Sequence, residues 1–402
     1  MKKVLSLICC TALILTFAAC KKQPASDTQQ TVPSTTVTTE PVTQPTETTA
    51  EKQEWDIVAP PTVSVALPIQ NETFKDVSGN VLLNYNTSYI VLSMSEQEIA
   101  DRITLEFLNR IDETVGDKDT ILASAKKAFS GSGNWNPYQY TVTYEPKRVD
   151  NGVISLLGCD VRYLGAHIDK VYNSVNYSAT TGHNLSLLNI INGDDKIDEL
   201  SELVIDVLTR LKDELCLYED FEKTVNSHFS DGVNDAWFFS ENGLCFFFSP
   251  YDIAPYSSGV VVAEIPYEKL LGIIRDDFYP PEQANTPGII AAKEYDENTV
   301  DTFSKYTELT IHKDGKKFLL YTDKYVSNIN ITIGSRTSNN MLIDQYCIFA
   351  QSGLAQGEAI AVTADIDADH CLQITYRSGD KMIHSDIVYD AATGEISIME
   401  TE

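Results

Sequence analysis

The sequence predicts an α+β fold: an antiparallel sheet with packed helices, followed by a small all-β sandwich or barrel domain. Strand-like runs follow one another between residues 138 and 182 instead of alternating with helices. Two stretches, 95–115 and 196–215, place apolar residues every three or four positions, which is typical of amphipathic helices. Beyond residue 287 the patterning is strand-like throughout.

The first domain is expected over residues 56–283 and opens with apolar, strand-like runs. Ser95, with Glu98 three residues later, predicts a capping box at the start of the first helix. A second helical stretch is expected over 120–129, and the SGSGNWNP segment after Phe129 ends it.

Three strand-like runs follow, and the second and third are expected to be neighbours in an antiparallel meander. In the third run Val171, Val175 and Tyr177 share one face. The helix at 196–215 comes next. The turn Glu241-Asn242-Gly243 between two phenylalanine-rich runs predicts a hairpin. A strand and a short helix, over 267–278, complete this domain.

The second domain is expected over residues 287–402, after a boundary marked by Thr286-Pro287-Gly288. Asp314-Gly315 predicts a hairpin between the strand-like runs on its two sides. The remaining runs are short and alternate, which favours a β-sandwich or barrel that acts as a binding or spacer module.

The N-terminus has the layout of a secretory signal. Lys2 and Lys3 precede an apolar run of about 14 residues, too short to span a bilayer. Ala18 and Ala19 then precede Cys20, and this arrangement resembles the lipobox of bacterial lipoproteins. The resemblance implies that residues 1–19 are removed and that lipid on Cys20 anchors the chain to the outer face of the cell membrane. The alternative is an ordinary signal peptide with an incidental cysteine.

Residues 20–55 are rich in Thr, Pro, Gln and Glu, and their apolar residues are scattered. Such a segment buries too little apolar surface to offset its conformational entropy. We therefore expect a lipidated cysteine followed by a disordered stalk.

The formal net charge is −28, and it becomes −30 when Lys2 and Lys3 leave with the signal. This disfavours nucleic acid as a partner, because phosphate affinity comes from Lys and Arg. The negative charge favours a cationic partner, because electrostatic attraction speeds its association with the protein. The alternative is that the acidity serves solubility alone.

No cofactor or metal is expected. The five cysteines after residue 20 have no CxxC spacing, which disfavours zinc. Cys347 and Cys371 either pair or stay free like the others. Asp365, Asp367 and Asp369 have the first EF-hand offsets, but His370 occupies the position that requires glycine.

Motifs of common enzymes, such as GxSxG, HExxH and the phosphate loop, are lacking in the sequence, so a non-catalytic protein is expected. A catalytic pair of carboxylates, as used for glycoside chemistry, needs only to be close in space and leaves no sequence motif. A cell-wall modifying enzyme with an unrecognised site therefore stays as the alternative, beside a structural spacer.

The candidate binding residues are Tyr251, Asp252, Pro255 and Tyr256. Pro250 and Pro255 stiffen the loop that carries them. Tyrosines on a rigid loop are common in binding faces because little rotamer freedom is lost on contact. The alternative is that the tyrosines pack over a sheet edge and that Asp252 caps a turn.

Four motifs carry a resemblance over residues 60–275. They are Gly165-Ala166-His167, TGHNLSL at 181–187, GLCFFFSPYDIAPYSSG at 243–259, and IPYEKL at 265–270. Together they resemble the RsiV-like extracytoplasmic domain of lysozyme-sensing anti-sigma factors, which also accompanies a catalytic domain in some peptidoglycan deacetylases of Gram-positive bacteria.

The resemblance implies a cell-envelope role and a partner such as lysozyme, another cationic protein, or a cell-wall component. The chain has no apolar run long enough to transmit a signal across the membrane, so it is not itself expected to be an anti-sigma factor. We expect a lipid-anchored, non-catalytic binding protein outside the cytoplasm.

Overall fold

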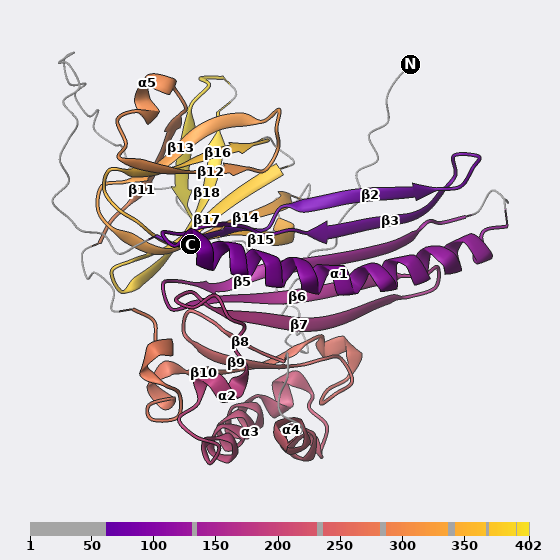
Figure 1. Ribbon diagram of the computed structural model, residues 1–402. Coiled ribbons are helices and arrows are strands. Elements are labelled where there is room, and N and C mark those ends of the chain that lie inside the picture. The colour runs from indigo at the N-terminus through magenta and orange to yellow at the C-terminus, as the bar shows by residue number, and fades with distance from the viewer. Residues whose placement is uncertain are drawn as a thin grey trace, which may run out of the picture.

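The computed structural model describes residues 62–130, 135–230, 236–281, 287–336, 342–366, 370–390 and 392–401. The predicted signal peptide, Cys20 and the stalk lie outside the described residues. The described part combines helices with mostly antiparallel sheets, as an α+β class requires (Figure 1).

A five-stranded sheet forms the middle of the molecule. Its order is β2 (Ile69–Lys75), β3 (Val81–Ser88), β5 (Tyr138–Val149), β6 (Val153–Tyr163) and β7 (Ile168–Ser178). The helix α1 (Gln97–Ala128) lies along one face, where Ile103 and Phe107 pack against Tyr144 (Figure 1). The predicted antiparallel pairing of the second and third runs is confirmed as β6–β7, and β5 pairs with β6 on its other side. Val175 and Tyr177 lie on the face that α1 covers.

The predicted start and division of the first helix are wrong. The cap residue is Glu96 rather than Ser95, and no side chain caps the first turn. One continuous helix of 32 residues replaces the two expected ones, and Gly116 lies inside it. The apolar face of the helix is packed as far as Ile121 and Ala125. This packing keeps the helix continuous past Gly116, where helix propensity is low.

A second unit, which we call the phenylalanine-rich unit, comprises residues 187–278 and lies below the central sheet (Figure 1). Its helices are α2 (Leu187–Ile190), α3 (Lys196–Leu215) and α4 (Phe221–Ser230), and its strands are β8 (Trp237–Phe239), β9 (Gly243–Phe248) and β10 (Val261–Pro266). The predicted helix at 196–215 and the hairpin at 241–243 are confirmed.

Two elements of this unit differ from expectation. The helix α4 was not predicted from the sequence. The short helix expected over 267–278 is instead two 3-10 turns, Tyr267–Lys269 and Asp276–Phe278. Gly272 lies between them with a φ of 75°, which a continuing right-handed helix does not permit.

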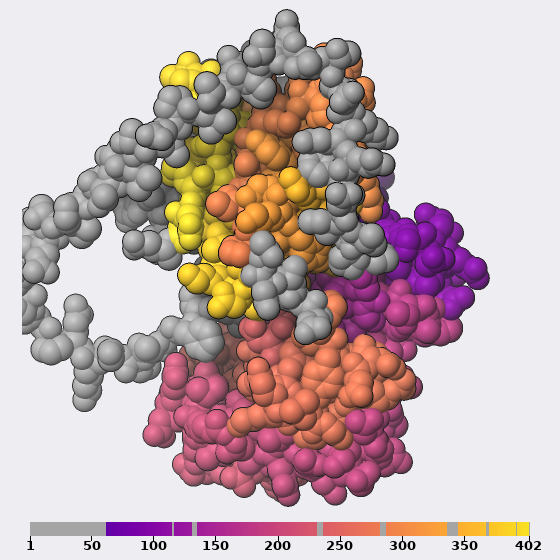
Figure 2. Space-filling view, turned by 90° about the vertical axis from the view of Figure 1, so that its left-hand side faces the viewer, coloured from indigo at the N-terminus to yellow at the C-terminus, as the bar shows by residue number. Residues whose placement is uncertain are grey.

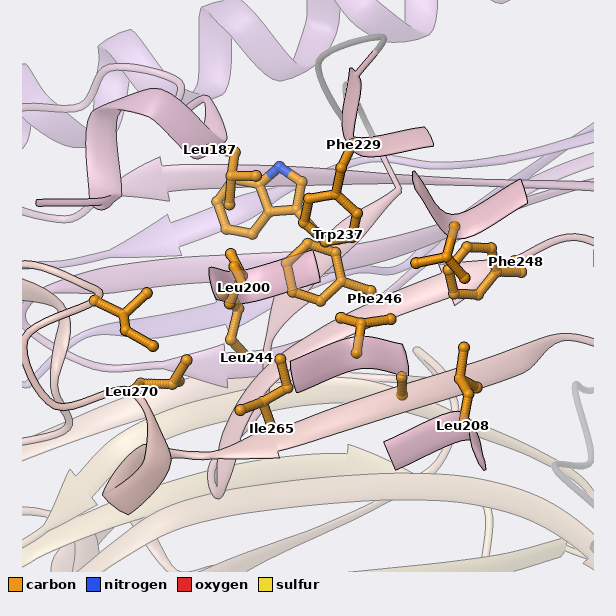
Figure 3. Close-up of a cluster of buried hydrophobic side chains, with 14 of the residues drawn as sticks. Leu187, Leu200, Leu208, Phe229, Trp237, Leu244, Phe246, Phe248, Ile265 and Leu270 are labelled. Carbon is orange, nitrogen blue, oxygen red and sulfur yellow. The ribbon is translucent and has the colours of Figure 1, made fainter. Parts of the chain in front are cut away.

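The phenylalanine-rich strand β9 is buried on both faces. Phe246 and Phe248 point toward the helices of the unit and join Leu200 and Leu208 of α3 in one cluster (Figure 3). Phe247 and Cys245 point the other way, toward Leu157 of the central sheet. The run of aromatic residues therefore fills two interfaces of the core, and the binding candidates lie in the loop that follows it.

The C-terminal part is strand-rich. Its elements are β11 (Ile290–Glu294), α5 (Glu297–Val300), β12 (Lys305–Thr310), β13 (Lys316–Thr322), β14 (Val326–Arg336), β15 (Leu342–Leu354), β16 (Glu358–Ala364), β17 (His370–Ser378), β18 (Lys381–Tyr389) and β19 (Ile396–Glu400). The strands form two sheets, and Phe318, Ile331 and Ile360 lie in the core between them. In Figure 2 these strands (orange to yellow) form the upper part of the molecule.

The hairpin predicted at Asp314-Gly315 is wrong, because β12 and β13 are not neighbours. The strand β16 lies between them and pairs in parallel with β12 and antiparallel with β13. A turn-forming dipeptide specifies the local reversal of the chain but not which strand fills the adjacent place in the sheet.

Two short strands from the N-terminal part join the C-terminal sheet. The strand β1 (Ser64–Ala66) pairs with β15, and β4 (Val91–Ser93) pairs with β1 at the sheet edge. The predicted boundary near residue 286 therefore does not coincide with the boundary between sheets. The division into two folding units stays a prediction.

Candidate functional site

The candidate site is the tyrosine loop, residues 249–259, between β9 and β10. Two residues at its centre, Ile253 and Ala254, are buried and pack in the hydrophobic core. The Tyr218 amide donates to the Ile253 carbonyl oxygen at 2.9 Å, and the Ser258 hydroxyl donates to the Leu215 carbonyl oxygen at 2.8 Å. The loop is thereby fixed against the C-terminal end of α3.

Tyr251 has an unusual backbone conformation. Its φ is 76°, in the left-handed region that bulky residues seldom adopt. The Tyr251 amide donates to the Ala254 carbonyl oxygen at 3.0 Å, so the surrounding loop holds the residue in place. Strain of this kind costs on the order of 1–3 kcal/mol and is concentrated at functional sites.

The two tyrosine side chains lie together on the surface. Tyr251 is 66% exposed and Tyr256 is 49% exposed. Their ring centroids are 5.6 Å apart, with 32° between the ring planes. The loop therefore presents a preorganised aromatic surface to solvent, which costs little further ordering when a partner covers it.

Asp252 and Pro255, the other two candidates, shape the loop. The Asp252 carboxylate accepts a hydrogen bond from the Ser249 amide at 2.7 Å, so it caps the turn. Pro255 is half-buried and precedes the 3-10 turn Tyr256–Ser258. All four candidates lie in one loop, with Asp252 and Pro255 in positioning roles. Tyr251 is largely exposed, and the Tyr256 hydroxyl lies 3.5 Å from the Ile168 carbonyl oxygen at the edge strand β7.

The surroundings of the tyrosine loop are acidic. Residues 189–268 contain 17 Asp and Glu against four Lys and Arg, a net charge of −13. Asp213 and Glu214, in the last turn of α3, and Asp220 just beyond it are exposed. The carbonyl groups at the C-terminal end of α3 add partial negative charge. Sequence reasoning did not place α3 beside this loop, because no local signal links segments this far apart.

None of the five cysteines of the described residues forms a disulfide, so Cys347 and Cys371 do not pair. Burial raises the pKa of the Cys159 thiol to about 12 and that of Cys347 to about 12. Burial also raises the pKa of Cys245. These thiols are protonated at neutral pH and therefore unreactive, whereas Cys216 is exposed.

Within the described ranges, no group of three or more His, Cys, Asp or Glu side chains is arranged to hold a metal ion. Asp365 contacts His312 at 2.9 Å, and Asp367 and Asp369 lie outside the described residues. Across the same ranges, none of the helices is both long enough and apolar enough to cross a bilayer.

Comparison with known protein families gives one match, and it lies within the phenylalanine-rich unit. Residues 189–268 match the family described as "Protein of unknown function (DUF3298)". This segment is a DUF3298 domain. It begins in α2 and contains α3, α4, β8, β9, the tyrosine loop and β10, so the candidate site lies within it.

Two solved structures of DUF3298 family proteins are similar to the chain. One, from Bacteroides fragilis NCTC 9343, is 18% identical with a TM-score of 0.39, and the match covers 54% of this chain and 94% of that one. The other, from Pseudomonas aeruginosa PAO1, is 18% identical with a TM-score of 0.35, covering 54% and 98%. No curated protein gives a significant match.

Proposed function

We propose that this chain is a lipid-anchored, RsiV-like binding protein of the cell envelope, without catalytic activity, which captures a cationic protein such as lysozyme through its DUF3298 domain. The exposed tyrosine pair at a strained position carries the proposal. The net charge of −13 over residues 189–268 supports a cationic partner, because it speeds encounter with positive charge. A cell-wall component is the alternative ligand.

The tyrosine rings are the expected anchors. Truncation of a buried interface tyrosine costs on the order of 2 kcal/mol or more of binding free energy. We expect Tyr251→Ala and Tyr256→Ala each to raise the dissociation rate for lysozyme by about 30-fold, since 1.4 kcal/mol corresponds to a factor of ten. Surface plasmon resonance with the immobilised chain measures this rate.

Tyr251→Gly and Tyr306→Ala are the matched controls. Tyr251→Gly should abolish the contact between the Tyr251 ring and lysozyme. Because glycine adopts the left-handed conformation at no steric cost, the midpoint of thermal unfolding should stay equal or rise. Tyr306 is also exposed but lies on β12 of the C-terminal sheet, so its loss should leave binding unchanged. A lower midpoint for both Tyr251 variants would mean that the ring has a structural role instead.

The anchor is the second part of the proposal, and it rests on the residues around Cys20. Cys20→Ala removes the thiol that would carry lipid, so the variant should leave the membrane fraction and incorporate no labelled palmitate. Equal palmitate incorporation into the wild type and the variant would contradict a lipid anchor at this residue.

A further inference from the structure

Next to the tyrosine loop, the strand β7 forms an edge of the central sheet (Figure 1). Its antiparallel register with β6 runs without a break from Ile168 to Ser178. Along such a strand, successive residues direct their backbone N–H and C=O groups alternately toward the partner strand and away from it. The orientation observed at one end of β7 therefore holds along its whole length.

The C-terminal end of β7 shows which residues face away from β6. The Ser178 amide donates to the His183 carbonyl oxygen at 2.9 Å, and the Leu185 amide donates to the Asn176 carbonyl oxygen at 2.6 Å. Even-numbered residues of β7 therefore direct their backbone groups outward. At this end of the edge, residues 183–185 already satisfy them.

The N-terminal end of the same edge is uncovered. By the alternation, Ile168, Lys170 and Tyr172 also direct their backbone groups away from β6. No strand of the described ranges pairs with β7 on that side along residues 168–172. Exposed backbone edges of this kind are templates for pairing with another chain.

The two faces of this edge differ in character. Tyr172 packs against the phenylalanine-rich unit, and on this face the Tyr256 hydroxyl lies 3.5 Å from the Ile168 carbonyl oxygen. On the other face, the Asp169 side chain is 54% exposed and Val171 is 50% exposed. An added strand places alternate side chains beside the Tyr256 ring and beside Asp169, an arrangement that fits apolar and basic residues in alternation.

We propose that residues 168–172 of β7 bind an extended segment of a cationic partner, in which basic and apolar residues alternate, as an added strand of the central sheet. The inference rests on the proposed capture of a cationic protein and specifies how that partner is held. Backbone hydrogen bonds to Lys170 and Tyr172 supply affinity, and the contacts of alternate side chains with Tyr256 and Asp169 supply specificity.

Charge favours a separate cationic partner over a second copy of this chain. Each chain carries a formal net charge of −28, so two copies repel one another, whereas a basic segment is attracted. The opposite edge strand, β2, offers an added strand little apolar contact. Its exposed residues are all polar, namely Gln70, Asn71, Thr73 and Lys75.

Residue-resolved amide hydrogen exchange of the full chain tests the added strand, with a peptide of about eight alternating lysine and valine residues as the probe. Without the peptide, the Lys170 and Tyr172 amides should exchange rapidly. At saturating peptide their exchange should slow by about tenfold or more, because each amide then donates to the added strand. The amides of β2 should not change, and a peptide of alternating glutamate and valine should have no effect.

Lys170→Pro tests the backbone contact directly. Proline has no amide hydrogen, and the donor that is lost at residue 170 faces away from β6, so the β6–β7 ladder is retained. We expect this variant to bind the peptide about three- to tenfold more weakly than Lys170→Ala, which loses the same side chain but keeps the amide. The exchange measurement uses the wild-type chain and does not depend on the folding of either variant.

The added strand is overturned if the peptide leaves both amides unprotected, or if Lys170→Pro and Lys170→Ala bind it equally well. It is also overturned if protection of these amides rises with protein concentration in the absence of peptide, because a second copy then covers the edge. Lysozyme binding that depends on Tyr251 but leaves both amides unprotected would support capture by the tyrosine loop and contradict the added strand.

Discussion

Replacing Arg148 by alanine should lower the free energy of unfolding by about 3–5 kcal/mol, because it leaves the Asp150 carboxylate buried without its partner. The Arg148 side chain is only 3% exposed. It donates to Asp150, to the Tyr267 hydroxyl and to the Phe278 carbonyl oxygen. Its guanidinium also lies over the rings of Phe239 and Tyr267. One side chain thus ties the central sheet to the phenylalanine-rich unit.

Urea unfolding followed by circular dichroism measures this change. Arg275→Ala is the matched control, because Arg275 also pairs with an aspartate two positions along, Asp277, at 2.9 Å, but is 49% exposed. An exposed pair contributes about 0–1 kcal/mol, so this variant should stay close to the wild type. Equal effects of the two substitutions would contradict the role assigned to Arg148.

Gly243→Ala should destabilise the phenylalanine-rich unit by about 3 kcal/mol or more, because a rigid backbone group occupies the space that the methyl needs. A Cβ at residue 243 would lie 2.0 Å from the Ile265 carbonyl oxygen and 3.1 Å from the Pro266 Cα. Gly243 pairs with Pro266 across the β9–β10 ladder, so relief requires these strands to separate.

Gly116→Ala is the control for this substitution. Gly116 lies inside α1, and a Cβ there meets no atom within 4 Å. Alanine should raise the free energy of unfolding by about 0.5–1 kcal/mol, since glycine is the weaker helix former. Thermal unfolding of both variants provides the comparison, and a Gly243→Ala protein as stable as the wild type would mean that the β9–β10 spacing is not as tight as described.

Local patterns were sufficient for part of the fold. The helix at 196–215 has a regular apolar stripe that includes Leu200, Val204 and Leu208, and its limits agree with the prediction. The Glu241-Asn242-Gly243 turn lies between two phenylalanine-rich runs, so the β8–β9 hairpin was also predicted. In both cases residues close together in the sequence are sufficient to predict the element.

Other features depend on contacts that the sequence does not display. The parallel pairing of β12 with β16 is decided across a gap of about fifty residues, so the turn at Asp314-Gly315 misled the prediction. The Arg148 hydrogen bonds span 119 and 130 residues. At the candidate site, the prolines predicted a rigid loop, but neither the left-handed conformation of Tyr251 nor the neighbouring end of α3 has a sequence signal.

The most direct test of the proposed function is a calorimetric titration of residues 56–402 with lysozyme at about 50 and 300 mM salt. We expect a one-to-one complex that weakens at the higher salt, because screening reduces the attraction between the acidic domain and a cationic partner. We also expect Tyr251→Gly to remove most of the binding at both salt concentrations. No detectable heat with the wild-type protein at low salt, or binding that is insensitive to both salt and Tyr251, would contradict capture of a cationic protein by the tyrosine loop.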